Sequence, residues 1–430
     1  MKPVLENDLI FPVTFEFGGA SVAEYQVNGG KTQWAAHEVS EKRKAELAAS
    51  GKLAQHELDD FVCGSACKFD EYFREDMEMA AHELGMNALR FGAEPAKVMP
   101  AKNVFDDDYL ALCLEKVRFA KSVGIKPFFN IWHWTIPVWW EDEGGMAAPN
   151  APIYFAQYTE KLVEVLGDEV EYWITLNETN VFILLSYVLG QWPPQLKDEA
   201  TAAIVFENLV ECHQRAYEII KRHNPNAKVG IAQNLGWNEV VEDTPENWIE
   251  KEKRDQDWNW SFLDRINMDF IGMNHYGRTR IGGSSDFKPE IISDFGWELY
   301  PEAIYHIIME TYARYKLPII ITENGLADEA DTRRGWFIFE TMKWIHKAIE
   351  DGAHVFGYLH WSLLRNFEWA EGWTKDFGLI YVDLKNNLKR TIRPSARFFG
   401  AICRARAITK EIVSKYRGVI TLPKKEVDDE

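Results

Sequence analysis

The chain has 430 residues and a net charge of −19, from 67 acidic and 48 basic side chains. A negative field of this size repels nucleic acids and anionic membranes, so neither is an expected partner. The hydrophobic fraction of 46% and the charged fraction of 27% are those of a globular protein, and the length suits one large domain or two to three average ones.

The chain has five cysteines, an odd number without a disulfide framework, which favours a reducing compartment. Cys63 and Cys67 stand four positions apart, but no second pair and no histidine cluster accompanies them, so we expect no metal site. The first residues lack a basic segment followed by an apolar core, and no later window approaches roughly 18 uncharged apolar residues. We therefore expect a cytoplasmic protein, and the oligomeric state stays open.

Short apolar runs alternate with longer amphipathic segments along the whole chain, and no linker divides them. In chain order, the predicted strands are Val13–Phe17, Ala88–Phe91, Pro127–Ile131, Tyr172–Leu176, Val229–Ala232, Phe270–Met273, Ile319–Thr322 and Val355–Leu359. Segments with helical spacing lie between them at Tyr109–Val123, Ile153–Leu166, Ala202–Arg222, Glu302–Tyr315 and Gly335–Asp351.

Continuous apolar strands that alternate with helices indicate parallel pairing, with the helices covering the sheet. Eight such units favour a closed barrel over an open doubly wound sheet, and the dinucleotide-binding alternative lacks its G-x-G-x-x-G after the first strand. We predict an α/β fold, a single-domain (β/α)8 TIM barrel at residues 1–406. Residues 407–430 are a charged C-terminal extension of unassigned role, either a surface extension or an oligomer contact.

Polar and aromatic residues gather at the carboxyl ends of six of the eight predicted strands. These residues are Arg90-Phe91, Asn130-Ile131-Trp132-His133-Trp134, Asn177-Glu178, Asn274-His275-Tyr276, Glu323-Asn324-Gly325 and His360-Trp361. A barrel of this kind places its chemistry at that end of its strands, so the pattern predicts a functional site there.

Two glutamates, Glu178 and Glu323, each close an apolar run that is typical of a buried strand. Burying an unpaired charge is costly, so packing alone does not explain them. Cleavage of a glycosidic bond needs one carboxylic acid for the leaving oxygen and a second carboxylate as base or nucleophile. The alternative is a pair of strand-end glutamates in salt bridges or helix caps. The 17 tryptophans suit sugar faces, although they also suit large cores.

The residues at the strand ends belong to longer blocks that follow one another along the chain. The blocks are Gly18–Gln26, Arg90-Phe91, Trp132-His133-Trp134, Ile174–Glu178, Ile321–Gly325, Gly357–Trp369, Phe377–Asp383 and Arg393–Ala396. They resemble the signature blocks of the family-one glycoside hydrolases, which are the β-glucosidases, β-galactosidases and their relatives. The resemblance runs to about residue 405 and implies an eight-stranded barrel with a retaining mechanism.

By this resemblance, Glu323 is the nucleophile that forms the glycosyl-enzyme, and Glu178 is the acid that becomes the base. Arg90 and Tyr276 match the neighbours of the nucleophile, and Asn177 matches the residue that binds the sugar 2-hydroxyl group. Glu178 must be protonated near neutral pH, so we expect its pKa to be raised, partly by repulsion from Glu323. The two carboxyl groups of a retaining enzyme stand about 5–5.5 Å apart.

The resemblance also implies a pocket for the non-reducing sugar. Its polar residues are Gln26, His133, Trp134, Asn274 and Glu368, its stacking residues are Trp361 and Trp369, and Phe377 closes its edge. Taken alone, His133 suits a core histidine and Trp361 suits core packing. Members that act on 6-phosphorylated sugars usually replace the residue at Glu368. A carboxylate there repels a phosphate, so we expect a neutral glycoside.

Four features depart from the family pattern. Thr179 replaces the proline of Asn-Glu-Pro, Pro95 stands where the family has a tryptophan, and Arg365 replaces an aspartate. Arg365 brings a cation near the pocket or points outward. The two catalytic blocks also lie closer together than usual, which shortens the loops after the fifth and sixth strands. We expect these shorter loops to leave the leaving-group side more open.

The sequence thus favours a retaining exo-β-glycosidase that removes a terminal β-linked glucosyl, galactosyl or fucosyl residue from small β-glycosides or oligosaccharides. It needs no cofactor and no metal, and the same mechanism allows an alcohol to replace water. One alternative is another main substrate, such as a mannoside or a plant glucoside. A second is a catalytically silent carbohydrate-binding protein, whose mark would be the loss of either glutamate. A third is a cofactor-carrying barrel that admits a flat aromatic ligand.

Overall fold

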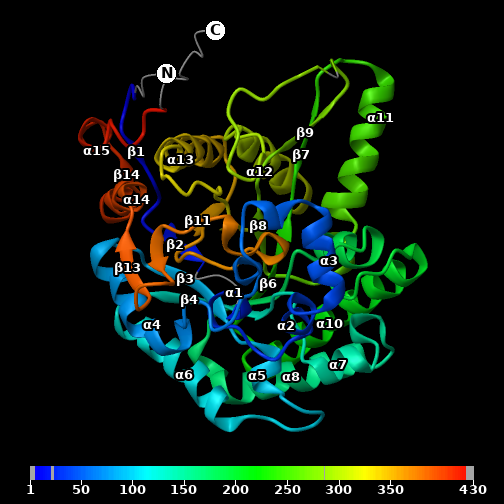
Figure 1. The fold of residues 1–430 in the computed structure, drawn as a ribbon. Helices are drawn as coiled ribbons and strands as arrows, with labels where there is room; N and C mark the ends of the chain where they lie inside the picture. The colour runs from blue at the N-terminus through cyan, green and yellow to red at the C-terminus, as the bar shows by residue number, and fades with distance from the viewer. Residues whose placement is uncertain (1–4, 21–23, 285, 423–430) are drawn as a thin grey trace.

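Eight parallel strands close a barrel in the computed structural model, which describes residues 5–20, 24–284 and 286–422 (Figure 1). In chain order, the barrel strands are β2 (Glu16–Ala20), β3 (Ala88–Gly92), β4 (Lys126–Trp132), β5 (Tyr172–Asn177), β6 (Lys228–Asn234), β8 (Phe270–Asn274), β10 (Ile319–Glu323) and β11 (Val355–Trp361). Each pairs in parallel with the next barrel strand, and β11 closes the circle against β2. The predicted (β/α)8 barrel is confirmed.

The first barrel strand lies three residues later than predicted. Val13 is exposed and stands in a turn, in which the Phe15 amide donates to the Pro12 carbonyl at 2.9 Å. The strand instead contains two glycines, and a Cβ on Gly18 would lie 1.9 Å from the Ala88 carbonyl oxygen. Close approach of the backbone therefore selects glycine here, and it overrides the apolar pattern on which the prediction rested.

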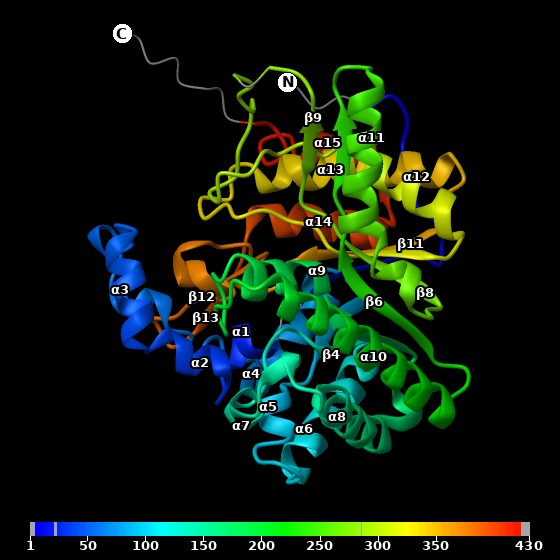
Figure 2. The same cartoon turned by 90° about the vertical axis from the view of Figure 1, so that its right-hand side faces the viewer.

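Helices surround the barrel on its outer side (Figures 1 and 2). They are α1 (Glu24–Asn28), α2 (Gln33–Glu38), α3 (Glu41–Ala49), α4 (Phe69–Glu78), α5 (Pro95–Val98), α6 (Asp107–Ser122), α7 (Val138–Asp142), α8 (Ala151–Leu166), α9 (Thr179–Ile183), α10 (Glu199–His223), α11 (Pro245–Arg254), α12 (Ala303–Tyr315), α13 (Arg334–Glu350), α14 (Pro394–Ala405) and α15 (Lys410–Lys415). The five predicted helices correspond to α6, α8, α10, α12 and α13. None of the helices in the described residues is long and apolar enough to cross a bilayer.

Short helical segments join several of these elements. The 3-10 segments are η1 (Lys52–Ala54), η2 (Leu58–Phe61), η4 (Gly145–Ala147), η5 (Gly167–Glu169), η8 (Leu263–Arg265) and η9 (Trp369–Thr374). The π-helical segments are η3 (Met79–Glu83), η6 (Leu184–Val188) and η7 (Asp255–Trp260), and η7 directly continues α11.

The core has an inner and an outer part because strand side chains alternate between the two faces. The inner cluster fills the barrel with Ala88, Phe128, Ile174, Ala232, Phe270, Ile320 and Leu359. On β10, Ile320 belongs to this cluster, whereas Ile319 and Ile321 belong to the larger cluster that the helices share. Because both faces of each strand are packed, the position of the residue at the carboxyl end of the strand is fixed.

Within the part of the chain that the structure describes, three two-stranded sheets lie outside the barrel. They are β1 (Leu9–Ile10) with β14 (Ala407–Ile408), β7 (Trp237–Val240) with β9 (Arg278–Ile281), and β12 (Ile380–Asp383) with β13 (Lys389–Ile392). Figure 2 shows α11, β7 and β9 together on one side of the molecule. Within residues 407–422, Ile420 is fully buried, and a Cβ on Gly335 would lie 2.4 Å from the Val419 carbonyl oxygen, so this part of the chain contacts the barrel domain. A separate extension at 407–430 stays a prediction.

Candidate active site

Glu178 and Glu323 lie at the same end of the barrel. Glu323 is the last residue of β10, and Glu178 directly follows β5, with a left-handed backbone at φ 41°. Both are almost fully buried, at 4% and 3% exposure. Parallel strands have therefore brought together two carboxyl groups that stand far apart in sequence.

A cation and a hydroxyl group hold Glu323. Arg90 donates from Nη1 to Oε1 of this carboxylate, and the Tyr276 hydroxyl donates to Oε2 at 2.9 Å. Burial raises the pKa of Glu323, and Arg90 and Tyr276 oppose that rise because they stabilise its charged form. Arg90 is itself buried, so water does not screen the ion pair.

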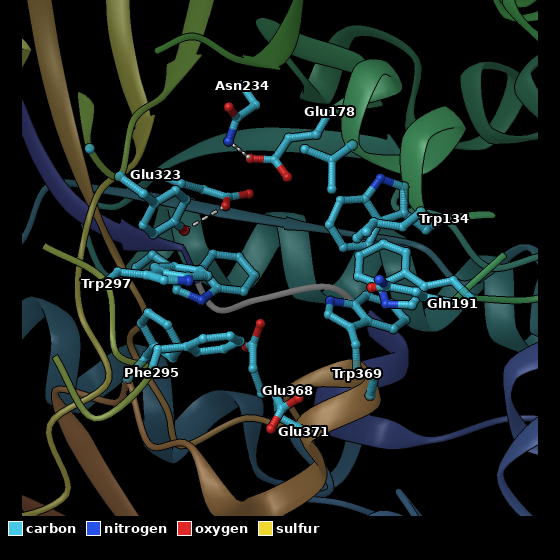
Figure 3. Close-up of a pocket in the computed structure, with 18 of the residues that line it drawn as sticks. Trp134, Glu178, Gln191, Asn234, Phe295, Trp297, Glu323, Glu368, Trp369 and Glu371 are labelled. Carbon is cyan, nitrogen blue, oxygen red and sulfur yellow. Dashed lines mark hydrogen bonds between the residues drawn. The ribbon is translucent and has the colours of Figure 1, made fainter. Parts of the chain in front are cut away.

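Two amides hold Glu178, and no cation does so among the hydrogen bonds of the described residues. Its Oε1 accepts from Asn234 Nδ2 at 3.1 Å (Figure 3). The same oxygen accepts from Asn274 Nδ2 at 3.0 Å. Burial, and then the negative charge of Glu323, raise the pKa of Glu178 to about 8. Glu178 is therefore mostly protonated at neutral pH, the direction that a general acid needs.

Asn177 links the surroundings of the two carboxyl groups. Its Oδ1 accepts from Arg90 Nη2 at 2.6 Å and from Asn274 Nδ2 at 3.0 Å. Its Nδ2 lies 3.0 Å from His133 Nε2. Burial and the nearby Arg90 lower the pKa of His133 well below its ordinary value, so the ring is neutral and accepts this proton.

The two carboxyl groups line a cavity of about 580 Å³ whose walls are largely aromatic (Figure 3). On one side, the ring centroid of Trp134 lies 5.0 Å from that of Trp369 and 4.6 Å from that of Trp192. On the other side, Phe295 stacks on Trp297 with centroids 4.1 Å apart. Flat rings on both sides suit the faces of a sugar and of an apolar leaving group.

Most of the predicted sugar contacts line this cavity. Those that do are His133, Trp134, Trp361, Glu368, Trp369 and Phe377, with Glu178, Glu323 and Tyr276. Arg90, Asn177 and Asn274 lie behind them and are buried. Gln26 is fully buried but is not among the described lining residues, and its Nε2 donates to the Phe367 carbonyl at 2.9 Å. Residues 21–23 of the first block lie outside the described residues.

Glu368 faces the cavity from the side opposite the catalytic pair (Figure 3). Its Oε2 accepts from Asn366 Nδ2 at 2.7 Å, and burial raises its pKa to about 8. Much of its charge is therefore absent at neutral pH, which weakens the predicted repulsion of a phosphate. A different feature opposes a phosphate: Arg278, the one lysine or arginine among the described lining residues, already pairs with Glu239 and Glu298.

The three substituted positions keep their local structure by other contacts. The amide and hydroxyl of Thr179 donate to Gln233 Oε1 at 3.2 and 3.1 Å, which holds the turn after Glu178. Pro95 begins α5, where its missing N–H costs nothing. Arg365 is not among the described lining residues: its Nη2 donates to the Trp373 carbonyl at 3.0 Å.

Several cavity residues were not predicted from the sequence. They are Gln191, Trp192, Asn234, Trp258, Phe295 and Trp297. Asn234 ends β6, so the rule that points to strand ends would have found it. Trp258 stands in η7, and Phe295 and Trp297 lie in the segment after β9, where no motif marks them.

A sequence model described as glycosyl hydrolase family 1 matches residues 7–280 and 277–408. The chain belongs to this family. Among its family 1 relatives, β-glucosidase A of Acetivibrio thermocellus is 30% identical over 91% of this chain and 98% of the relative. The galactolipid galactosyltransferase SFR2 of Arabidopsis thaliana is 29% identical over 77% of this chain, which spans only 57% of that protein.

Solved structures of family 1 enzymes superpose on nearly the whole chain. The β-glycosidase from Pyrococcus horikoshii has a TM-score of 0.83 at 31% identity, over 97% of this chain and 99% of that one. The β-glucosidase from Thermotoga maritima in complex with glucoimidazole has a TM-score of 0.83 at 26% identity, over 93% of this chain and all of that one. The predicted family resemblance is confirmed.

Proposed function

We propose that this family 1 glycosyl hydrolase is a retaining exo-β-glycosidase that removes a terminal β-D-glucosyl residue, with galactosyl and fucosyl residues as further substrates. The observation that carries the proposal is the asymmetry of the two carboxyl groups. Glu323 faces the Arg90 cation, whereas the hydrogen bonds to Glu178 come from neutral amides. A nucleophile must be ionised and a general acid must be protonated, so the two environments suit these two roles.

In the first step, an oxygen lone pair of Glu323 forms a bond to the anomeric carbon. The electron pair of the glycosidic C–O bond moves to the leaving oxygen, which takes the proton of Glu178. In the second step, Glu178 removes a proton from water, and the water oxygen attacks the anomeric carbon as the bond to Glu323 breaks. Two inversions at the anomeric carbon give net retention. A separation of about 5–5.5 Å between the carboxyl groups stays a prediction.

The remaining lining residues supply contacts for the sugar. Trp361 and Trp369 offer ring faces, and His133 and Glu368 offer hydrogen-bonding groups to hydroxyl groups. Asn177 is placed between the two carboxyl networks, which suits a contact to the 2-hydroxyl group that strengthens in the transition state. The related β-glucosidase from Thermotoga maritima was solved in complex with glucoimidazole, which supports a glucosyl site in this chain.

Transfer of the sugar to an alcohol is a second candidate activity. The stacked rings of Phe295 and Trp297 give the cavity an apolar side that would hold an alcohol with an apolar body. Such an acceptor would replace water in the second step. The related Arabidopsis protein is a galactolipid galactosyltransferase, which supports sugar transfer as an activity of this chain.

The test is a panel of nitrophenyl β-glycosides, with an alkyl β-glucoside as the poor leaving group, assayed with wild type, Glu323→Gln and Glu178→Gln. Glu323→Gln should lose essentially all turnover, because no intermediate forms. Glu178→Gln should lose roughly 10²–10⁴-fold with a poor leaving group and much less with a good one, where azide should restore the second step.

The matched control is Glu94→Gln. Glu94 is another fully buried carboxyl group, with its pKa raised by burial to about 7, but it caps α5 and does not line the described cavity. This variant should keep its activity. Retention of most activity by Glu323→Gln, or equal losses in all three variants, would overturn the proposed function.

A further inference from the structure

Both amides that contact Glu178 donate to the same oxygen. Asn234 and Asn274 each place Nδ2 within 3.1 Å of Oε1. Figure 3 shows the second oxygen of Glu178 facing the centre of the cavity. A carboxylic acid accepts best through its carbonyl oxygen, so two donors at Oε1 assign the proton to Oε2. This arrangement aims the acidic proton at the cavity, provided that both amides keep their orientation.

Arg90 fixes the orientation of Asn274. A guanidinium can only donate, so Asn177 must present Oδ1 to Arg90 Nη2. The same Oδ1 also receives Asn274 Nδ2. A flipped Asn274 would bring two acceptors together, so its Nδ2 stays directed at both Asn177 and Glu178.

Trp258 fixes the orientation of Asn234 in the same manner. The indole N–H can only donate, and it lies 3.1 Å from Asn234 Oδ1. A flipped amide would place two donors against each other. Asn234 must therefore keep Oδ1 toward Trp258 and Nδ2 toward Glu178.

The position of Trp258 is itself held by the side chains of Asn180, on α9, and of its neighbour Asn259. Asn180 Nδ2 donates to the backbone carbonyls of Asn234 and Trp258, at 2.9 and 3.1 Å. The next residue in η7, Asn259, exchanges hydrogen bonds of 2.9 Å with the backbone of Gly236. The π-helical segment is thus tied to the end of β6, which keeps the indole in register with Asn234.

We propose that Trp258 is a positioning residue for the acid of this enzyme: through Asn234 it holds one of the two amide donors on Oε1 of Glu178, so that Oε2 carries the proton to the leaving oxygen. The inference rests on the proposed function, because it assumes that Glu178 is the acid. Without the indole N–H, the Asn234 amide is free to turn and present its oxygen to Oε1. The proton then moves to Oε1, where it points away from the leaving group.

The test is Trp258→Phe, which keeps an aromatic ring but lacks the N–H. With an alkyl β-glucoside, whose departure needs a proton, kcat/KM should fall about tenfold. With a dinitrophenyl β-glucoside, whose departure needs none, it should change by less than about threefold. The control is Trp297→Phe, which shortens another indole of the same cavity without touching Asn234, and which should affect both substrates alike. Equal losses on both substrates with Trp258→Phe, or the same leaving-group dependence in Trp297→Phe, would overturn the proposal.

A second variant decides the matter if Trp258→Phe does not fold. Asn234→Asp has nearly the same shape, but it offers only oxygens to Trp258 and to Glu178 Oε1. The variant draws the Glu178 proton to Oε1, so kcat/KM should fall more with the alkyl β-glucoside than with the dinitrophenyl β-glucoside. An equal loss on both substrates would overturn the proposal. Glu178→Gln is measured in parallel. If Glu178→Gln loses equally on the alkyl and dinitrophenyl glucosides, the assignment of Glu178 as the acid fails together with the positioning role. If Glu178→Gln loses more on the alkyl glucoside, but Trp258→Phe and Asn234→Asp do not, the positioning role alone fails.

Discussion

Glu178 and Glu323 share one cavity, yet their neighbours give the two carboxyl groups different protonation. Glu323 accepts hydrogen bonds from a guanidinium and a phenol, and Glu178 accepts them from two amides. Each negative charge disfavours the other, so the group without a cation keeps its proton to higher pH. The chemistry of the site therefore depends on where Arg90 donates.

This difference predicts how activity depends on pH. The kcat/KM for a poor leaving group should fall as pH rises through about 8, because Glu178 then loses its proton in the free enzyme. A pH profile of an alkyl β-glucoside measures this limb. Glu178→Gln has no titrating group at this position, so its kcat/KM should no longer fall as pH rises through about 8. If kcat/KM still fell in this variant, another group would be responsible for the fall.

Removing the charge of Glu323 should lower the pKa of Glu178, because repulsion by Glu323 is the second cause of its raised pKa. Titration of tryptophan fluorescence in Glu323→Gln measures this shift, since Trp134 lines the cavity with Glu178. Glu371→Gln is the control: this carboxyl group lines the same cavity, but burial and Glu323 are the two main causes of the raised pKa of Glu178, so this variant should shift it less. Equal shifts in both variants would contradict the account.

Single residues were predictable from the sequence only where a strand fixed their direction. Glu178, Glu323 and Tyr276 follow or end barrel strands, and the sequence placed them at one site. Trp258 lies in a π-helical segment whose position depends on the Asn180 and Asn259 contacts, which no local pattern encodes. The roles predicted for the site residues, including that of Gln26 as a sugar contact, stay predictions.

At the scale of elements, the barrel interior sets the position of the site. Ile320 is fully buried inside the barrel, three residues before Glu323. Ile320→Ala should lower the free energy of unfolding by about 2–5 kcal/mol, because the surrounding strands cannot close the cavity that remains. Urea titration measures the loss. Ile153→Ala on α8 is the control: this side chain is exposed, so its loss should stay within about 0.5 kcal/mol. Equal losses would contradict the assignment of Ile320 to the core.

Seven barrel strands were predictable because strands buried on both faces form continuous apolar runs. The first strand was placed too early, because Gly18 and Gly19 give no hydrophobic signal and are selected by close backbone contact. The outer pair β7 and β9 was not predicted, and nor was the aromatic wall at Phe295 and Trp297. These elements lie in connecting segments, where length and composition do not determine the path of the chain.

At the scale of the whole molecule, several carboxyl groups outside the site are buried and have a raised pKa. Burial raises the pKa of Asp76 to about 6 and those of Glu38, Glu94 and Glu141 to about 7. The ordinary pKa is 4.5 for a glutamate and 3.8 for an aspartate. Above these values the unfolded chain has released protons that the folded protein still binds on these four groups. The stability that these four groups contribute should therefore decrease as pH rises from their ordinary values to about 7, whereas buried histidines such as His213, whose pKa burial lowers to about 4, act in the opposite direction below about pH 6.5.

Glu94→Gln should reduce this decrease. The group shifts from 4.5 to about 7, so it accounts for up to about 3 kcal/mol of the fall in the free energy of unfolding between about pH 5 and pH 8. Urea titrations of wild type and variant at the two pH values measure the difference. An unchanged fall in the variant would show that Glu94 is ionised in the folded protein throughout this range.

The covalent bond between the sugar and Glu323 is the central claim, and peptide mass spectrometry tests it most directly. A β-glucoside with a good leaving group, and with fluorine in place of the 2-hydroxyl group, slows the second step, so the intermediate accumulates. After digestion, the fluorinated sugar should be found on Glu323, and Glu323→Gln should stay unlabelled. A label on any other residue, or an unlabelled protein that still hydrolyses β-glucosides, would contradict the account.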